Sequence, residues 1–122
     1  MHASIGWILI VSGAVTAAAG AAAFLAPGLL LKLIFRVDEP APATFFFVMH
    51  WGVLIALVGG LTVYAASDAA SRLPVLVAAA TEKFVIVGLV FFGPLKRTPG
   101  MTLIAVVDGL FALTYAAYLA GL

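Results

Sequence analysis

The sequence predicts an all-α membrane protein, a bundle of four antiparallel transmembrane helices with a short interfacial helix after the first. Hydrophobic residues make up 66% of the 122 residues and charged residues only 9%, and the mean hydropathy is +1.27. A soluble domain has roughly a quarter of its residues charged. Four apolar blocks of about 20 residues, enough to cross a bilayer core of roughly 30 Å, fill most of the chain. We therefore expect one integral membrane domain over residues 1–122.

Proline, glycine and charged residues separate the expected spans. The first span covers about residues 5–26 and ends at Pro27-Gly28, because proline cannot donate to the helix ladder. The remaining spans cover about residues 44–66, 73–92 and 101–122. Since the N-terminal region carries no Lys or Arg, we expect the first block to be an uncleaved span rather than a signal peptide.

Small residues recur at helical spacing on the first two spans. The stripe on the first span consists of Gly6, Gly13, Ala17, Gly20 and Ala21, and the stripe on the second consists of Gly52, Ala56 and Gly60. Small side chains allow a neighbouring helix to approach closely, which is how spans associate in lipid. We expect both stripes to serve helix packing rather than ligand binding.

A short apolar segment with two cations follows the first span. Residues 28–36 are too few to cross a bilayer, and Lys32 and Arg36 are four residues apart, which puts them on one helical face. Leucines, Ile34 and Phe35 remain for the other side. This pattern is typical of a helix that lies in the membrane interface with its cations towards lipid phosphates.

The positive residues indicate the orientation of the chain. Lys32, Arg36, Lys96 and Arg97 fall in the first and third loops, whereas the second loop holds only Arg72. The positive-inside rule places the first and third loops in the cytoplasm, so both termini face the non-cytoplasmic side. The same four cations are the candidate contacts for lipid headgroups.

Four ionisable residues lie inside the apolar blocks and form the candidate site. From the cytoplasmic end of each span, His50, Lys83 and Asp108 come at similar depths at about 1.5 Å per residue. Glu82 precedes Lys83, but adjacent helical residues point about 100° apart, so we do not expect the two to pair. A charge at mid-bilayer costs about 2.5 kcal/mol or more unless it is paired. Each residue therefore needs a partner on another span.

The most economical pairing joins Lys83 to Asp108, since consecutive antiparallel spans are normally neighbours. Glu82 would then pair with His50 or with a hydroxyl of the first span, Ser12 or Thr16. One carboxyl or the imidazole could hold a proton, which makes the group a candidate titratable cluster. Three roles remain open for it: structural pairing, a ligand or proton site, and contact with a partner subunit.

Composition and motifs exclude several functional classes. A net charge of +1 without a basic stripe gives no surface for nucleic acid. The absence of cysteine excludes disulfides and thiolate metal sites. No motif specifies a reaction, a cofactor or a metal site. We favour an accessory or scaffolding membrane protein, a homo-oligomer or part of a larger complex. The alternative is a bundle that binds or transports a small lipophilic ligand such as a quinone or lipid, with possible proton linkage.

The chain loosely resembles small uncharacterised bacterial four-span proteins of the DoxX-like group. The matching features are Phe24-Leu25-Ala26-Pro27, Gly59, Tyr64-Ala65-Ala66, Arg72, Lys83, Asp108 and Phe111-Ala112. The resemblance implies no defined activity. It does imply location in a bacterial inner membrane. The small multidrug resistance transporters have a similar size, but their essential glutamate lies in the first span, where this sequence has Ser12 and Thr16.

Overall fold

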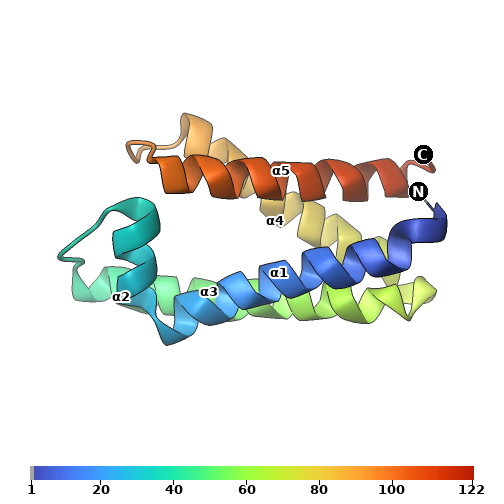
Figure 1. Ribbon diagram of the computed structural model, residues 1–122, viewed down its shortest axis with the longest axis horizontal. Helices are drawn as coiled ribbons and strands as arrows, with labels where there is room; N and C mark the ends of the chain where they lie inside the picture. The colour runs from blue at the N-terminus through green and yellow to red at the C-terminus, as the bar shows by residue number, and fades with distance from the viewer. Residues whose placement is uncertain (1) are drawn as a thin grey trace.

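The computed structural model of the chain describes residues 2–122 and is an all-α bundle of four long helices that run in alternating directions (Figure 1). The long helices are α1 (Ile5–Leu25), α3 (Pro42–Ala66), α4 (Arg72–Phe92) and α5 (Pro99–Leu119). A short 3₁₀ turn, Ala69–Ser71, leads into α4. The predicted fold class is confirmed, and the helices begin and end close to the expected bounds of the spans.

Helices α1 and α3 form the closest pair in the bundle because glycines line their interface. A Cβ atom added to Gly20 would lie 2.5 Å from the carbonyl oxygen of Gly52, and one added to Gly59 would lie 2.5 Å from that of Gly13. Both distances are too short for real Cβ contacts, so the two backbones touch at these positions. The predicted packing role of the stripes is therefore confirmed.

The stripe on the second span was predicted wrongly at one position. Gly60 faces open space, where an added Cβ would meet nothing within 4 Å, and its neighbour Gly59 contacts α1 instead. The interface of α3 follows Gly52, Ala56 and Gly59, at spacings of four and three. This spacing keeps the residues on one face of a helix of 3.6 residues per turn, whereas successive steps of four drift off that face.

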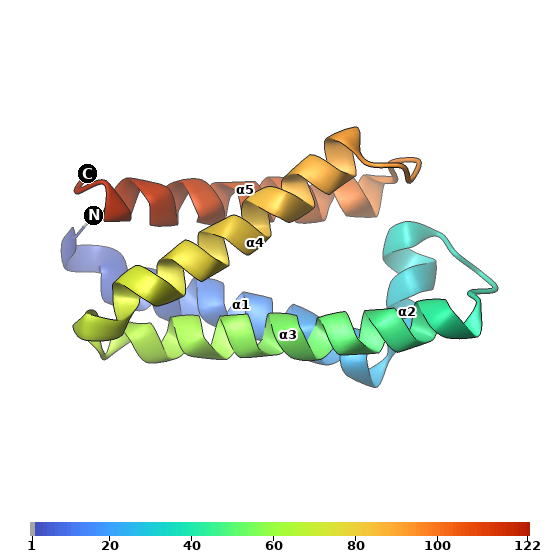
Figure 2. The same cartoon turned by 180° about the vertical axis from the view of Figure 1, so that it is seen from behind.

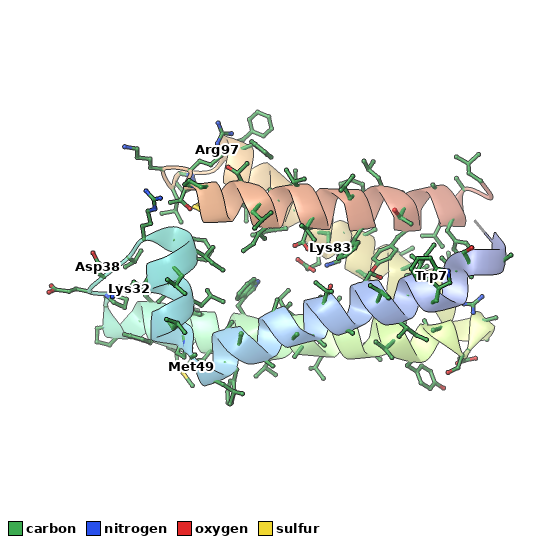
Figure 3. The ribbon with its side chains drawn as sticks, in the orientation of Figure 1. Trp7, Lys32, Asp38, Met49, Lys83 and Arg97 are labelled. Atoms are coloured by element: carbon green, nitrogen blue, oxygen red, sulfur yellow. The ribbon has the colours of Figure 1, made fainter. Side chains whose placement is uncertain are left out.

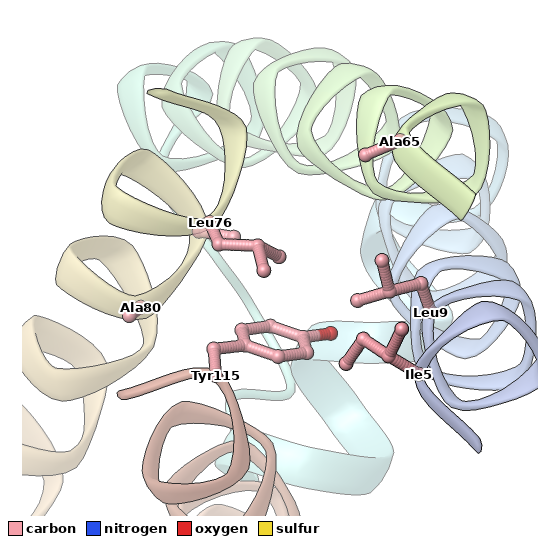
Figure 4. Packing of buried hydrophobic residues seen from close by; sticks show 7 residues of the cluster. Ile5, Leu9, Ala65, Leu76, Ala80 and Tyr115 are labelled. Carbon is pink, nitrogen blue, oxygen red and sulfur yellow. The ribbon is translucent and has the colours of Figure 1, made fainter. Parts of the chain in front are cut away.

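Helix α4 crosses the bundle obliquely, close to α3 at the end that holds the chain termini and closer to α5 at the other (Figures 1 and 2). At the terminal end the four helices close around a hydrophobic core (Figure 4). Ile5 and Leu9 of α1, Leu76 of α4 and Tyr115 of α5 meet there and are almost fully buried. Because α4 diverges from α3, the opposite half of the bundle is wider.

A short helical segment closes the wide end. Helix α2 (Pro27–Leu30) continues into a π-helical turn, Leu31–Phe35, and together they form a strap across the ends of the long helices (Figure 1). Thr98 Oγ1, just before α5, donates a hydrogen bond to the carbonyl oxygen of Ile34. The strap is the predicted short helix after the first span.

The apolar side chains of the strap divide between the bundle interior and the outside. Leu31 is buried, and Ile34 packs at the edge of a second core cluster formed by α4 and α5. Leu29 and Leu33 are exposed on the outside of the strap. In a strap that lies at a membrane surface, these exposed leucines would contact acyl chains.

Candidate functional site

Lys83 is the centre of a polar cluster inside the bundle. Its side chain is only 2% exposed, and its Nζ lies 3.2 Å from Asp108 Oδ1 and donates a hydrogen bond of 2.8 Å to Thr16 Oγ1. The ring centroid of Phe111 lies 5.4 Å from the same nitrogen. Lys83 therefore ties α4 to both α5 and α1, and the predicted pair with Asp108 is confirmed.

Glu82 is the least satisfied member of the cluster. Its Oε1 lies 3.9 Å from Lys83 Nζ, too far for a hydrogen bond but within range of an ion pair, although the two residues were not expected to pair. The same oxygen is buried and accepts no hydrogen bond from any residue of the described chain. The hydroxyls expected for Glu82 are occupied elsewhere, because Thr16 binds Lys83 and Ser12 binds Tyr115.

Hydroxyl groups extend the cluster towards the closed core. Thr16 donates to the carbonyl oxygen of Ser12 at 2.8 Å, and Tyr115 donates to Ser12 Oγ at 2.5 Å. Sequence reasoning did not include Tyr115 in the site. Its spacing from Asp108 could have indicated it, since residues seven apart share a helical face. The network joins α5 to α1, whose backbones do not pack closely.

A cavity of about 290 Å³ adjoins the cluster. Glu82, Lys83, Asp108 and Thr16 supply its polar wall, and the rest of the lining is apolar. The apolar lining comes from α1, α3, α5 and the strap: Val15, Ala19, Ala22, Leu30, Ile34, Trp51, Ile55, Leu103, Ile104 and Val107. Sites for small ligands have this character, an apolar hollow with a few convergent polar groups.

A second, larger cavity of about 530 Å³ lies beside the first, between the strap, α3 and α4. Leu30 and Trp51 line both cavities and therefore lie at their common boundary. Apart from Glu39 and Thr44, its lining is apolar and includes Phe47, Val48 and Ile86. The wide end of the bundle thus contains two neighbouring, mainly apolar cavities, the smaller of which reaches the polar cluster.

Three of the four predicted cluster residues meet, and the fourth does not. Glu82, Lys83 and Asp108 line the 290 Å³ cavity, whereas His50 is exposed on α3 and lines neither cavity. The rotation of His50 about its helix was therefore predicted wrongly, because it turns the imidazole outward. Neighbouring Trp51 points inward instead, since adjacent helical positions are about 100° apart.

The four predicted headgroup contacts are all exposed and lie at the strap end of the bundle. Lys32 is on the strap, and Arg97 is in the α4–α5 loop (Figure 3). The Arg97 guanidinium lies 4.8 Å from the ring centroid of Phe91, and Arg36 adopts a left-handed backbone conformation with φ 57°. Lys96 belongs to the same loop as Arg97. Their contact with lipid headgroups stays a prediction.

At the other end of the bundle, Arg72 holds the second loop in place. Its guanidinium donates to the carbonyl oxygens of Ala65 and Ala66, each at 2.8 Å. These carbonyls belong to the last turn of α3, which has no intrahelical donor for them. Arg72 is therefore engaged in capping α3.

The fold and its surface define a multi-pass membrane protein. In the part of the chain that the structure describes, four helices are long and apolar enough to cross a bilayer. Many large hydrophobic side chains point outward, including Phe92 at 91% exposed and Leu25 at 79%. No protein-family model, curated protein or solved structure matches the chain. The resemblance to the DoxX-like group therefore stays a prediction.

Proposed function

We propose that the protein binds a small lipophilic molecule within the membrane, in the 290 Å³ cavity beside Glu82, Lys83 and Asp108. The observation that carries the proposal is the cavity itself: a scaffold whose polar layer served only to fix helix register would fill the space around its charges. Here an apolar hollow reaches all three charged groups. Ligand pockets start at roughly 300 Å³, which is close to this volume.

The position of the cavity supports entry from the bilayer. Val15 of α1 and Leu103 of α5 line it and are exposed on the outside of the bundle, at 48% and 65%. The backbones of α1 and α5 do not pack closely, since side chains such as Tyr115 bridge them. A lipophilic molecule can therefore reach the cavity laterally between these two helices.

A cavity-filling substitution tests this function. Ala19 lines the cavity, and its neighbour Ala18 is exposed and lines neither cavity. We expect the protein purified from native membranes to carry a lipophilic molecule in native mass spectrometry, and Ala19→Leu to lose it. Ala18→Leu, the matched control, should keep it. An empty wild-type protein, or equal occupancy in both variants, would favour the scaffolding role instead.

We further propose that the protein lies in a bacterial inner membrane with both termini on the non-cytoplasmic side. The cationic strap and the α4–α5 loop share one end of the bundle, which supports the orientation expected from the positive-inside rule. The chain contains no cysteine, so single-cysteine variants give unambiguous labelling. Ser67→Cys should react with an impermeant maleimide in spheroplasts, and Lys96→Cys only after the membrane is opened. The reverse pattern would invert the topology.

A further inference from the structure

Resting on the proposed function, we infer that the ligand is a lipophilic primary amine whose ammonium group binds Glu82. The first observation is the buried Oε1 of Glu82, which accepts no hydrogen bond within residues 2–122. A buried polar atom without a partner is costly, and most such atoms in folded proteins are satisfied. Glu82 lines the cavity and its side chain is 22% exposed, so a donor bound there can approach the carboxylate, and a small rotation of the carboxylate would turn Oε1 towards it.

The second observation is the charge of the cluster. Two carboxylates, Glu82 and Asp108, face one ammonium, Lys83, which leaves one formal negative charge when all three are ionised. Lys83 Nζ has three protons and already has Thr16 and Asp108 as partners. A ligand that brings one positive charge completes the balance, whereas an anionic headgroup would add a second uncompensated charge in an apolar surrounding.

The third observation concerns the rest of the cavity. The walls beyond the polar cluster are apolar, and two of their residues, Leu30 and Trp51, also line the 530 Å³ cavity. An alkyl chain attached to the ammonium would be buried along this surface. Trp51 is among the lining residues, and indole rings attract cations, an attraction that strengthens when water is excluded. The combined features fit an amphiphile with a cationic head and a hydrocarbon tail.

Tryptophan fluorescence can test the head-group class. Trp7 is exposed at the far end of α1, so Trp7→Phe leaves Trp51 at the cavity boundary as the single reporter. This variant, reconstituted in phosphatidylcholine vesicles, would be titrated with dodecylammonium, dodecanol and dodecanoate. We expect dodecylammonium to bind roughly ten- to a hundredfold more tightly than the others, the usual effect of a hydrogen bond to a charged group.

Glu82→Gln in the Trp7→Phe background should remove the preference for the amine and leave dodecanol binding unchanged. Asp38→Asn is the matched control, because Asp38 is exposed and lines neither cavity. Equal or tighter binding of dodecanol or dodecanoate would overturn the inference while leaving the proposed function standing. The three titrations of the Trp7→Phe protein compare the head groups directly, so they test the inference even if Glu82→Gln fails to fold. If none of the three compounds alters Trp51 fluorescence, the proposed function itself fails.

Discussion

Lys83 Nζ donates a hydrogen bond of 2.8 Å to Thr16 Oγ1, and this contact joins α4 to α1 across a gap that their backbones do not close. The same nitrogen holds Asp108 of α5 at 3.2 Å. One buried side chain thus connects three helices at the level of the cavity. Because Lys83 also lines the 290 Å³ cavity, the stability of the bundle and the proposed binding of a ligand involve the same side chain.

A double-mutant cycle at Lys83 and Asp108 should measure how much the ion pair contributes to the free energy of unfolding. Lys83→Met leaves Asp108 buried without its cation, and removal of one partner from a buried pair costs about 3 kcal/mol or more. Asp108→Asn should also destabilise, and the double variant should lose at least about 1 kcal/mol less than the sum. Unfolding free energies in detergent measure all three.

Lys32→Met is the matched control for this cycle. It makes the same chemical change on the exposed face of the strap and should alter the unfolding free energy by less than about 0.5 kcal/mol. Additive losses for Lys83→Met and Asp108→Asn would show that the pair contributes no coupling energy, despite its geometry.

The hydroxyl of Tyr115 should contribute to the contact between α5 and α1. Tyr115→Phe keeps the buried ring but removes the donor to Ser12 Oγ, and hydrogen bonds between membrane helices are worth about 0.6 kcal/mol on average. We expect a loss of this size in unfolding free energy. Tyr64→Phe, at a residue 57% exposed, should have no effect. Equal values for the two variants would contradict a role for the Ser12 contact.

Much of this architecture follows from patterns that are local in the sequence. Hydropathy places the helices, and the short third loop makes α4 and α5 neighbours, which is enough to predict the pair of Lys83 and Asp108. Rotation about a helix axis is harder, because it depends on where the partner helix lies. Gly59 lies closer than Gly60 to the helical face of Gly52, and the position of α1 shows that this face is the one that packs.

The difficulty of predicting helix rotation also explains which site residues were predicted wrongly. His50 and Trp51 differ by one position, and the sequence does not show which of them faces the cavity. The hydroxyls of the first span were expected to bind Glu82. In the structure it is Lys83 Nζ that donates a hydrogen bond to Thr16 Oγ1. The cavity could not be predicted from the sequence, because its lining comes from four long helices and the strap and depends on how these are placed in space.

Replacing Gly20 or Gly60 with alanine should have opposite effects on stability. Gly20→Ala places a Cβ against the backbone of α3 and should separate α1 from α3, at about 1–3 kcal/mol, the usual cost of overpacking. Gly60→Ala points into open space and should stabilise α3 by up to about 1 kcal/mol, because alanine is the better helix former. Thermal unfolding in detergent compares the two. A stabilising Gly20→Ala would show that α1 and α3 pack less closely than described.

The hydroxyl of Thr98 should hold the strap against α5. It donates to the carbonyl oxygen of Ile34 and accepts from the backbone nitrogen of Met101 at 3.1 Å, which caps the first turn of α5. Thr98→Val should therefore lose about 0.5–2 kcal/mol of local stability, as other lost caps do. We expect faster hydrogen exchange in residues 31–37 and in the first turn of α5, with the terminal core unchanged.

Two further variants separate the effect of the hydroxyl from that of the methyl group. Thr98→Ser keeps both hydrogen bonds and should restore slow exchange in the strap. Thr114→Val makes the same change on α5 at a hydroxyl that bonds only within its own helix, to the carbonyl oxygen of Leu110, and should leave the strap unaffected. Since Leu30 and Ile34 of the strap line the 290 Å³ cavity, a loosened strap should also speed ligand exchange. Unchanged exchange in Thr98→Val would mean that apolar packing alone closes the wide end.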